Sequence, residues 1–220
     1  MSAEARVLLA TRNAAKLAEL RRILAASGTG AVQVLGLDDV PEFPETPETG
    51  ATFEANALAK ARAAAAATGL PAVADDSGLT VDALGGMPGV LSARWAGRHG
   101  DDEANLQLVL GQLGDVPPER RGAAFVCAAA LVLPSGEETV LRGEWRGVLT
   151  DAPRGANGFG YDPIFVPEGE RRTSAELEPA EKDAVSHRGR ALRALLPALC
   201  RLAPSAGVTA LPDHGTTWTI

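Results

Sequence analysis

Two adjacent aspartates followed by a serine and a glycine have the clearest chemical potential in this chain. They occupy residues 75–78, directly after the apolar run 72–74. Three kinds of structure use such a stretch: an aspartic-protease loop, a metal-holding strand end, and an ordinary turn built on an Asx hydrogen bond. A protease needs two aspartates that share a proton, so a single Asp-Ser-Gly would require a homodimer. The metal site and the turn are therefore the favoured interpretations.

Successive side chains of a strand point to opposite faces, so only one of Asp75 and Asp76 can face a given metal ion. A second carboxylate must come from another segment. The acidic loop at residues 38–50 offers Glu45 and Glu48. Mg²⁺ suits this set, because it often takes one or two carboxylates together with phosphate oxygens and waters.

A polar turn near the N-terminus lies where a predicted strand passes into a predicted helix. Free N–H groups at a helix start favour an anion, and a lysine one turn into the helix adds a positive charge. The glycines of the common phosphate-binding loop are missing, so simple helix capping remains an equal alternative. The turn consists of Thr11, Arg12, Asn13, Ala14, Ala15 and Lys16.

The stretch "GFGYDPIF" at residues 158–165 places two rings among glycines. Phe159 and Tyr161 could stack on a nucleobase, or they could pack on the sheet as an aromatic plug. Asp162 precedes a proline and is therefore held in an extended conformation, which fixes the direction of its side chain.

A cationic stretch follows in an otherwise acidic protein. Its positive charges could neutralise a triphosphate, or they could form a solvated helix face. These positive charges, the anion-binding turn, the carboxylates and the two rings together indicate a magnesium-dependent nucleoside-triphosphate enzyme. The stretch contains Lys182, His187, Arg188, Arg190 and Arg193.

The elements that must position these residues alternate between strand and helix in the first half of the chain. The second half contains a hairpin whose strands are separated by Pro134–Gly136, and then a mostly helical region. This order predicts an α/β protein with a mixed sheet. The expected strands lie at 6–10, 31–35, 72–76, 123–133 and 138–149. The expected helices lie at 14–27, 52–68, 91–96 and 101–113, and the mostly helical region at 174–202 contains one or two helices.

Composition limits the functional classes. The chain has 220 residues, 45% of them hydrophobic, a net charge of −7 and a pI of about 5.1. The acidic balance argues against a nucleic-acid polymer as partner. Cys127 and Cys200 form no Cys-x-x-Cys pair, which excludes a thiolate zinc site and a disulfide framework. No signal peptide or membrane span is expected, so we expect a soluble cytoplasmic protein.

Four segments, in this order and spacing, resemble the HAM1-like family of inosine/xanthosine triphosphate pyrophosphatases. The likeness runs from about residue 7 to residue 202. The segments are "ATRNAAKLAEL", "ETGATFEANALAKA" with "ADDSGLTVDALGGMPGVLSARWAG", "GFGYDPIF", and "SAELEPAEKDAVSHRGRAL".

The resemblance implies a homodimeric, magnesium-dependent enzyme of the nucleotide pool. It would hydrolyse ITP, dITP and XTP to the monophosphate and pyrophosphate, and so keep deaminated purines out of DNA and RNA. It also implies an elongated α/β fold, with a mixed sheet spanning two lobes, flanking helices and an active cleft between the lobes. Residues 1–203 would form this single two-lobed domain, and residues 204–220 a loosely ordered tail.

The resemblance also implies roles for the residues discussed above. Residues 11–16 would hold the triphosphate. Asp76 would be the general base or a metal-linked carboxylate, and Asp75 would assist it and belong to the metal ligands. Glu48 would be the second metal ligand, and Ser77 would lie near the substrate. Substrate contacts, mainly to the base, would come from Phe159, Gly160, Tyr161, Asp162, Lys182, His187 and Arg188.

The chain departs from the family at one position of interest. The usual Phe-x-Glu-Asn-Ala reads here as residues 53–57, "FEANA", so an alanine stands where a carboxylate is expected and Glu54 is left out of the metal set. Two rival functions stay open. One is a pyrophosphatase for modified pyrimidine or methylated nucleotides, and the other is a non-catalytic nucleotide sensor. Attack of water on either the α- or the β-phosphorus also stays open.

Overall fold

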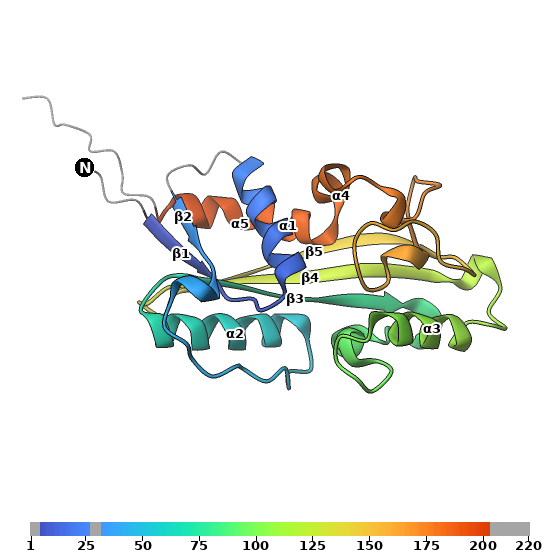
Figure 1. Cartoon of the computed structure of the whole chain (residues 1–220), viewed down its shortest axis with the longest axis horizontal. Coiled ribbons are helices and arrows are strands. Elements are labelled where there is room, and N and C mark those ends of the chain that lie inside the picture. The colour runs from blue at the N-terminus through green and yellow to red at the C-terminus, as the bar shows by residue number, and fades with distance from the viewer. Residues whose placement is uncertain (1–4, 27–31, 203–220) are drawn as a thin grey trace, which may run out of the picture.

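The computed structural model describes residues 5–26 and 32–202. Six strands form one mixed sheet in the order β2-β1-β3-β4-β5-β6, and the molecule is drawn out along its long central strands (Figure 1). β1 pairs in parallel with β2 and β3, whereas β3, β4, β5 and β6 pair antiparallel. The strands are β1 Ala5–Leu9, β2 Val32–Leu35, β3 Ala72–Val81, β4 Gly122–Val132, β5 Glu138–Leu149 and β6 Phe165–Pro167.

Helices cover both faces of the sheet. In the view of Figure 1, α1, α4 and α5 lie above it, and α2 and α3 lie below it. Their ends follow local signals: Thr52 caps α2 and Gly69 ends it in the left-handed conformation, while Asp101 caps α3. The helices are α1 Ala14–Ala26, α2 Phe53–Thr68, α3 Asp102–Gln112, α4 Pro179–Val185 and α5 His187–Cys200.

Three apolar clusters divide the molecule into two ends. At the end that contains β1, one cluster packs α1 and α5 on the upper face of the sheet, and a second packs the alanine-rich α2 on the lower face. At the other end, a third cluster joins α3 to the far halves of β3, β4 and β5 and to Phe165 of β6. The expected elongated mixed sheet, spanning two lobes, is confirmed.

The central strand β3 differs from its prediction. The sequence suggested a strand end and a tight turn at residues 75–78, but β3 continues to Val81 because β4 pairs with it along its full length. Gly78 serves a different purpose from a turn. A Cβ there would lie 2.3 Å from the Ser92 side chain, so the glycine allows the 3₁₀ turn Gly89–Arg94 to pack on the strand.

The parallel neighbour β1 stops early, and this creates the site. β1 pairs with β3 only at Leu8–Ala72 and Leu9–Val73, after which the chain turns away into α1. Asp75 and Asp76, which follow Val73 and Ala74 on β3, therefore lie just beyond the end of a parallel strand. This is the location where open α/β sheets characteristically bind ligands.

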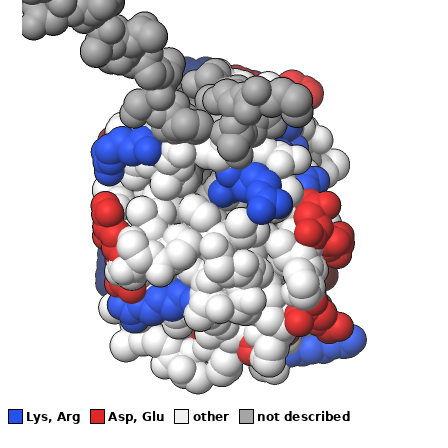
Figure 2. All heavy atoms as spheres, turned by 90° about the vertical axis from the view of Figure 1, so that its left-hand side faces the viewer, with Lys and Arg blue, Asp and Glu red and all other residues white. Residues whose placement is uncertain are grey.

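Figure 2 shows the end of the molecule that carries β1 and β2. Among the described residues on this face, positive and negative side chains are interspersed between uncharged ones. The described residues on this face therefore form no large basic surface of the kind that binds a nucleic-acid polymer. None of the helices in the described ranges is long and apolar enough to cross a membrane. The predicted tail, residues 204–220, lies outside the described residues.

Candidate active site

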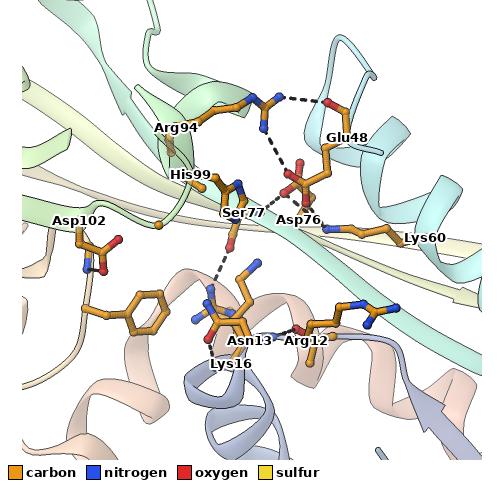
Figure 3. A pocket seen from close by; sticks show the side chains of 18 of the residues that line it. Arg12, Asn13, Lys16, Glu48, Lys60, Asp76, Ser77, Arg94, His99 and Asp102 are labelled. Atoms are coloured by element: carbon orange, nitrogen blue, oxygen red, sulfur yellow. Dashed lines mark hydrogen bonds and ion pairs between the residues drawn. The ribbon is translucent and has the colours of Figure 1, made fainter. Parts of the chain in front are cut away.

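A cavity of about 920 Å³ opens at the free edge of β3, between the two ends of the molecule. Figure 3 shows the turn before α1 on one side and residues from the acidic loop, α2 and the 3₁₀ turn on the other, with β3 between them. The cavity is thus built from segments far apart in the sequence. Its charged residues include Arg12, Lys16, Glu48, Lys60, Asp76, Arg94, Asp102, Asp162, Lys182 and Arg188.

The turn before α1 combines capping with access to the cavity. The Asn13 side chain accepts a hydrogen bond from the Lys16 N–H at 3.1 Å, and Thr11 Oγ1 accepts one from the Asn13 N–H at 3.2 Å. Thr11, Arg12, Asn13 and Lys16 all line the cavity, whereas the expected contacts at residues 14–15 do not. Helix capping is present, and the Arg12 and Lys16 side chains bring positive charge to the cavity, although Lys16 is also paired with Asp75 and Arg12 also donates to the Phe43 carbonyl.

Asp76 points from β3 toward α2 and is almost fully buried. Asn56 Nδ2 donates a hydrogen bond to its carboxylate at 2.9 Å, and Lys60 Nζ lies 3.7 Å away. Burial and the nearby charge of Glu48 raise the pKa of Asp76, although Lys60 and Asn56 act in the opposite direction. The carboxylate is thus oriented by Asn56 and faces the cavity, a placement that suits proton abstraction.

Glu48 faces the same part of the cavity from the acidic loop. Its carboxylate lies 2.7 Å from Lys60 Nζ and 3.4 Å from Arg94, and Arg94 also donates to the Glu48 backbone carbonyl at 3.0 Å. Burial opposes its ionisation, but the hydrogen bond and charge of Lys60, with the charges of Lys16 and Arg94, lower the pKa of Glu48. Lys60 therefore bridges Glu48 and Asp76.

Asp75 lies on the opposite face of β3 and does not line the cavity. It is 3% exposed, and its carboxylate lies 3.1 Å from Lys16 Nζ and 3.3 Å from Arg188 Nε. Burial opposes its charge, but Lys16 and Arg188 outweigh burial and hold the pKa of Asp75 far below its usual value. The residue thus stays charged and balances two cations.

Arg188, at the start of α5, is the centre of this buried network. Its guanidinium contacts Glu19 of α1 and Asp75, and it donates to Ser77 Oγ at 2.8 Å. Ser77 also lines the cavity, so the network reaches the site through that hydroxyl and through the edge of Arg188 itself. The network fixes α1, β3 and α5 relative to one another, because it joins side chains from all three.

The far end of the cavity is aromatic. The Phe159 ring lies 5.5 Å from Lys182 Nζ and 5.7 Å from Arg188 Cζ, within cation–π range. The Tyr161 hydroxyl donates to the Ser92 carbonyl at 2.8 Å, so its ring is held in the apolar cluster as well as against the cavity. A planar base could stack at this end.

His187 also belongs to the aromatic end. Its imidazole stacks on Phe125, with ring centroids 4.9 Å apart and 13° between the planes. Burial lowers the pKa of His187 well below its usual value, and the positive charges of Arg188 and Lys182 lower it further. The imidazole is therefore neutral at physiological pH, and it can donate a hydrogen bond to a nucleobase or accept one from it.

Asp162 holds the loop that carries Phe159. Its carboxylate accepts hydrogen bonds from Lys182 Nζ at 2.6 Å, Ser174 Oγ at 2.7 Å and the Phe159 N–H at 2.9 Å. The sequence predicts an extended Asp162 in direct contact with the substrate, but Asp162 begins the 3₁₀ turn Asp162–Ile164 and is therefore not extended. The residue lines the cavity but is only 2% exposed, and these protein donors occupy its oxygens.

Several residues of the site were missed from the sequence. Asn56 and Lys60 stand four positions apart on α2, which places them on one face of the helix, and that spacing was an available signal. Arg94 and Glu19 gave no comparable signal. Their partners, Glu48 and Arg188, are 46 and 169 residues away in sequence.

The chain is similar to known proteins over nearly its whole length. A model of the Ham1 family matches residues 7–198. A protein of Nocardia farcinica called dITP/XTP pyrophosphatase is 70% identical over 199 residues, which is 90% of this chain and 97% of that protein.

Solved structures agree with the sequence comparison. The crystal structure of a nucleoside-triphosphatase / dITP/XTP pyrophosphatase from Mycobacterium abscessus is 66% identical, with a TM-score of 0.72, and covers 87% of this chain and 99% of its own. A HAM1 protein from Coxiella burnetii is 43% identical, with a TM-score of 0.78, and covers 90% of this chain and 99% of its own.

Proposed function

This chain belongs to the Ham1 family, and from that premise we propose that it hydrolyses the non-canonical purine nucleoside triphosphates dITP, XTP and ITP. The products are the nucleoside monophosphate and pyrophosphate. The observation that carries the proposal is the 70% identity, over nearly the whole of both chains, to a protein named dITP/XTP pyrophosphatase. The cavity supports it, because one end is cationic and the other is aromatic.

The cationic end suits a triphosphate. Arg12, Lys16, Lys60 and Arg94 bring positive charge to the part of the cavity that also contains Asp76. Charged donors around phosphate oxygens stabilise both the bound substrate and the departing pyrophosphate. We assign Lys16 and Lys60 to the phosphates.

The donor set also fits a magnesium ion. Among the described residues no cluster of three or more His, Cys, Asp or Glu side chains could hold a metal without the substrate. Asp76 and Glu48, however, both line the cavity and are joined through Lys60. Mg²⁺ commonly takes one or two carboxylates and completes its shell with substrate phosphates and waters. We propose these two as ligands and leave out Asp75, whose carboxylate balances Lys16 and Arg188 instead.

The chemical step uses Asp76 as the base. Its carboxylate takes a proton from a water molecule as the water oxygen attacks the α-phosphorus, and the bond to the pyrophosphate oxygen breaks. When bound, Mg²⁺ supplies charge neutralisation on the phosphates and lowers the pKa of coordinated water. Lys16 and Lys60 offset the negative charge that develops on the leaving pyrophosphate. Asn56 keeps the Asp76 carboxylate oriented through its 2.9 Å hydrogen bond.

Selection of the base falls to the aromatic end. Phe159 provides the stacking surface, and the neutral His187 can hydrogen-bond a 6-keto group. A site built for a keto oxygen leaves buried polar atoms unpaired when adenine presents an amino group, which gives large discrimination.

A pyrophosphate-release assay tests the proposal. The purified chain is given ITP, XTP, dITP, GTP and ATP, with Mg²⁺ or with a chelator. We expect strong metal-dependent release from the first three, with IMP, XMP or dIMP as the second product. Orthophosphate as the primary product, or turnover only of modified pyrimidine nucleotides, would refute it. A folded chain that binds nucleotides without turning them over would instead be a sensor.

Labelled water decides which phosphorus is attacked. With ¹⁸O-water, attack on the α-phosphorus places the label in the monophosphate. Label in the pyrophosphate would show attack on the β-phosphorus and would contradict the mechanism above.

From family membership we propose three further properties. The chain forms a homodimer, works in the cytoplasm and removes deaminated purines from the nucleotide pool. Light scattering on the purified protein gives its mass directly, and a value of one chain, 22.7 kDa, would contradict the dimer.

A further inference from the structure

The loop that carries Phe159 is held at successive backbone positions. Gly158 and Gly160 flank the ring, and both have positive φ angles, 78° and 63°. Neither glycine has a side chain that could anchor the loop by packing. Hydrogen bonds to the backbone of the loop therefore help to place the ring, beside its contacts with Lys182 and Arg188.

The backbone N–H groups of Phe159 and Gly160 donate hydrogen bonds to two different carboxylates. The Phe159 N–H donates to Asp162 at 2.9 Å, within the same segment of the chain. The Gly160 N–H donates to Asp102 Oδ2, also at 2.9 Å. Asp102 belongs to α3, 58 residues earlier in sequence, so this second bond joins the loop to a different wall of the cavity.

Asp102 is free for this contact because another residue caps the helix. Asp101 is the N-cap of α3, and its side chain accepts a hydrogen bond from the Ala104 N–H. Asp102 is the first residue of the helix, is exposed, and lines the cavity together with Phe159. Figure 3 shows its side chain apart from the cluster of Glu48, Lys60 and Asp76.

We propose that Asp102 is a positioning residue for the base-binding end of the cavity. By fixing Gly160, it holds the Phe159 ring in the place where a nucleobase stacks. This inference rests on the proposed function for its substrate and deepens it, since it assigns to α3 a part in base recognition. The contact affects binding of the nucleobase rather than proton transfer, because Asp76, the proposed general base, lies beside Asn56 and Lys60.

The test compares two substitutions of this residue. Asp102→Ala removes the hydrogen-bond acceptor, and we expect KM for ITP to rise about tenfold while kcat changes less than about threefold, the pattern of lost uniform binding. Asp102→Asn keeps an oxygen that can accept from Gly160, and we expect it to restore KM to within about twofold of the wild type. If the asparagine variant is as impaired as the alanine variant, the carboxylate acts through its charge and the proposal is wrong.

Two controls separate positioning from general damage. Glu103→Ala removes a neighbouring carboxylate from the same helix turn, whose partner is Gln107 of the same helix, and we expect an unchanged KM. Inhibition by inorganic tripolyphosphate, which has no base, should be the same in the wild type and in Asp102→Ala. A parallel loss of tripolyphosphate affinity would mean that the whole cavity is disturbed, and would overturn the assignment.

Hydrogen exchange tests the contact without any substrate. The amide of Gly160 should exchange faster in Asp102→Ala than in the wild type or in Asp102→Asn. Equal protection in all three would refute the inference even if the enzyme is active. If the wild type hydrolyses none of the purine triphosphates, the proposed function fails while the exchange result still stands on its own.

Discussion

At the scale of single residues, the neighbouring aspartates of β3 show how the pleat of a strand separates two roles. Asp76 faces α2 and the cavity, where burial raises its pKa. Asp75 faces α1 and α5, where Lys16 and Arg188 keep it charged. One carboxylate is therefore placed for chemistry, while the other neutralises buried cations.

Replacing each aspartate by asparagine should produce opposite results. Asp76→Asn should lower turnover of ITP by at least about a hundredfold, because the proposed base is gone. Its stability should change by less than about 1 kcal/mol, because the cost of burying the charge disappears with the charge and Asn56 keeps an acceptor. Asp75→Asn should destabilise the fold by about 3–5 kcal/mol, because it leaves buried cations without their partner.

Both quantities are needed to judge this pair. Steady-state kinetics give turnover, and urea denaturation gives the free energy of unfolding. An active Asp76→Asn enzyme would remove that residue from the mechanism. An Asp75→Asn protein as stable as the wild type would show that Arg188 and Lys16 are balanced by other groups.

At the scale of elements, the approach of α5 to β5 positions the base end of the cavity. A Cβ on Gly143 of β5 would lie 2.0 Å from the carbonyl oxygen of His187 and 2.7 Å from the Ala191 nitrogen. The glycine therefore allows the first turn of α5 to lie directly on the strand. That turn carries His187 and Arg188.

Gly143→Ala should push α5 away from the sheet. Overpacking of this kind costs about 1–3 kcal/mol. The displacement should also raise KM for ITP, because His187 and Arg188 move with the helix. The measurements are urea denaturation and steady-state kinetics on the same preparation.

Gly111→Ala is the matched control for Gly143→Ala. Gly111 lies inside α3, and a Cβ there would meet no atom within 4 Å. A helical glycine of this kind should gain about 0.5–1 kcal/mol on substitution, with KM unchanged. Equal stability changes in the two variants would contradict the packing argument.

Elements were predictable from the sequence where local signals suffice. Thr52 and Gly69 mark the ends of α2, and Pro134–Gly136 separates the hairpin strands, because capping and turn chemistry act over a few residues. The continuation of β3 past Asp76 was not predictable, because it depends on pairing with β4 about 50 residues later. Arg94 was missed for the same reason, since its partner Glu48 is fixed by tertiary structure.

At the scale of the whole molecule, the cavity links regions that pack separately. Its lining runs from Ala10 to Arg188 and includes residues from both ends of the elongated sheet. Charged and aromatic side chains are thereby buried between apolar clusters, and their ionisation becomes part of the stability of the fold. His187 shows this linkage most directly, because it is stacked on Phe125 and almost fully buried.

The global stability should fall as the pH drops below about 6.5. The unfolded chain binds a proton on His187 near the ordinary value of 6.5, whereas burial lowers the pKa of the folded imidazole and keeps it neutral. Protons therefore favour the unfolded state, and the free energy of unfolding should decrease by about 1 kcal/mol between pH 8 and pH 5.5 from this residue alone. His187→Gln cannot take up the proton, so its stability should be flatter over the same range. Urea denaturation at several pH values gives both curves, and parallel curves would show that another group controls this transition.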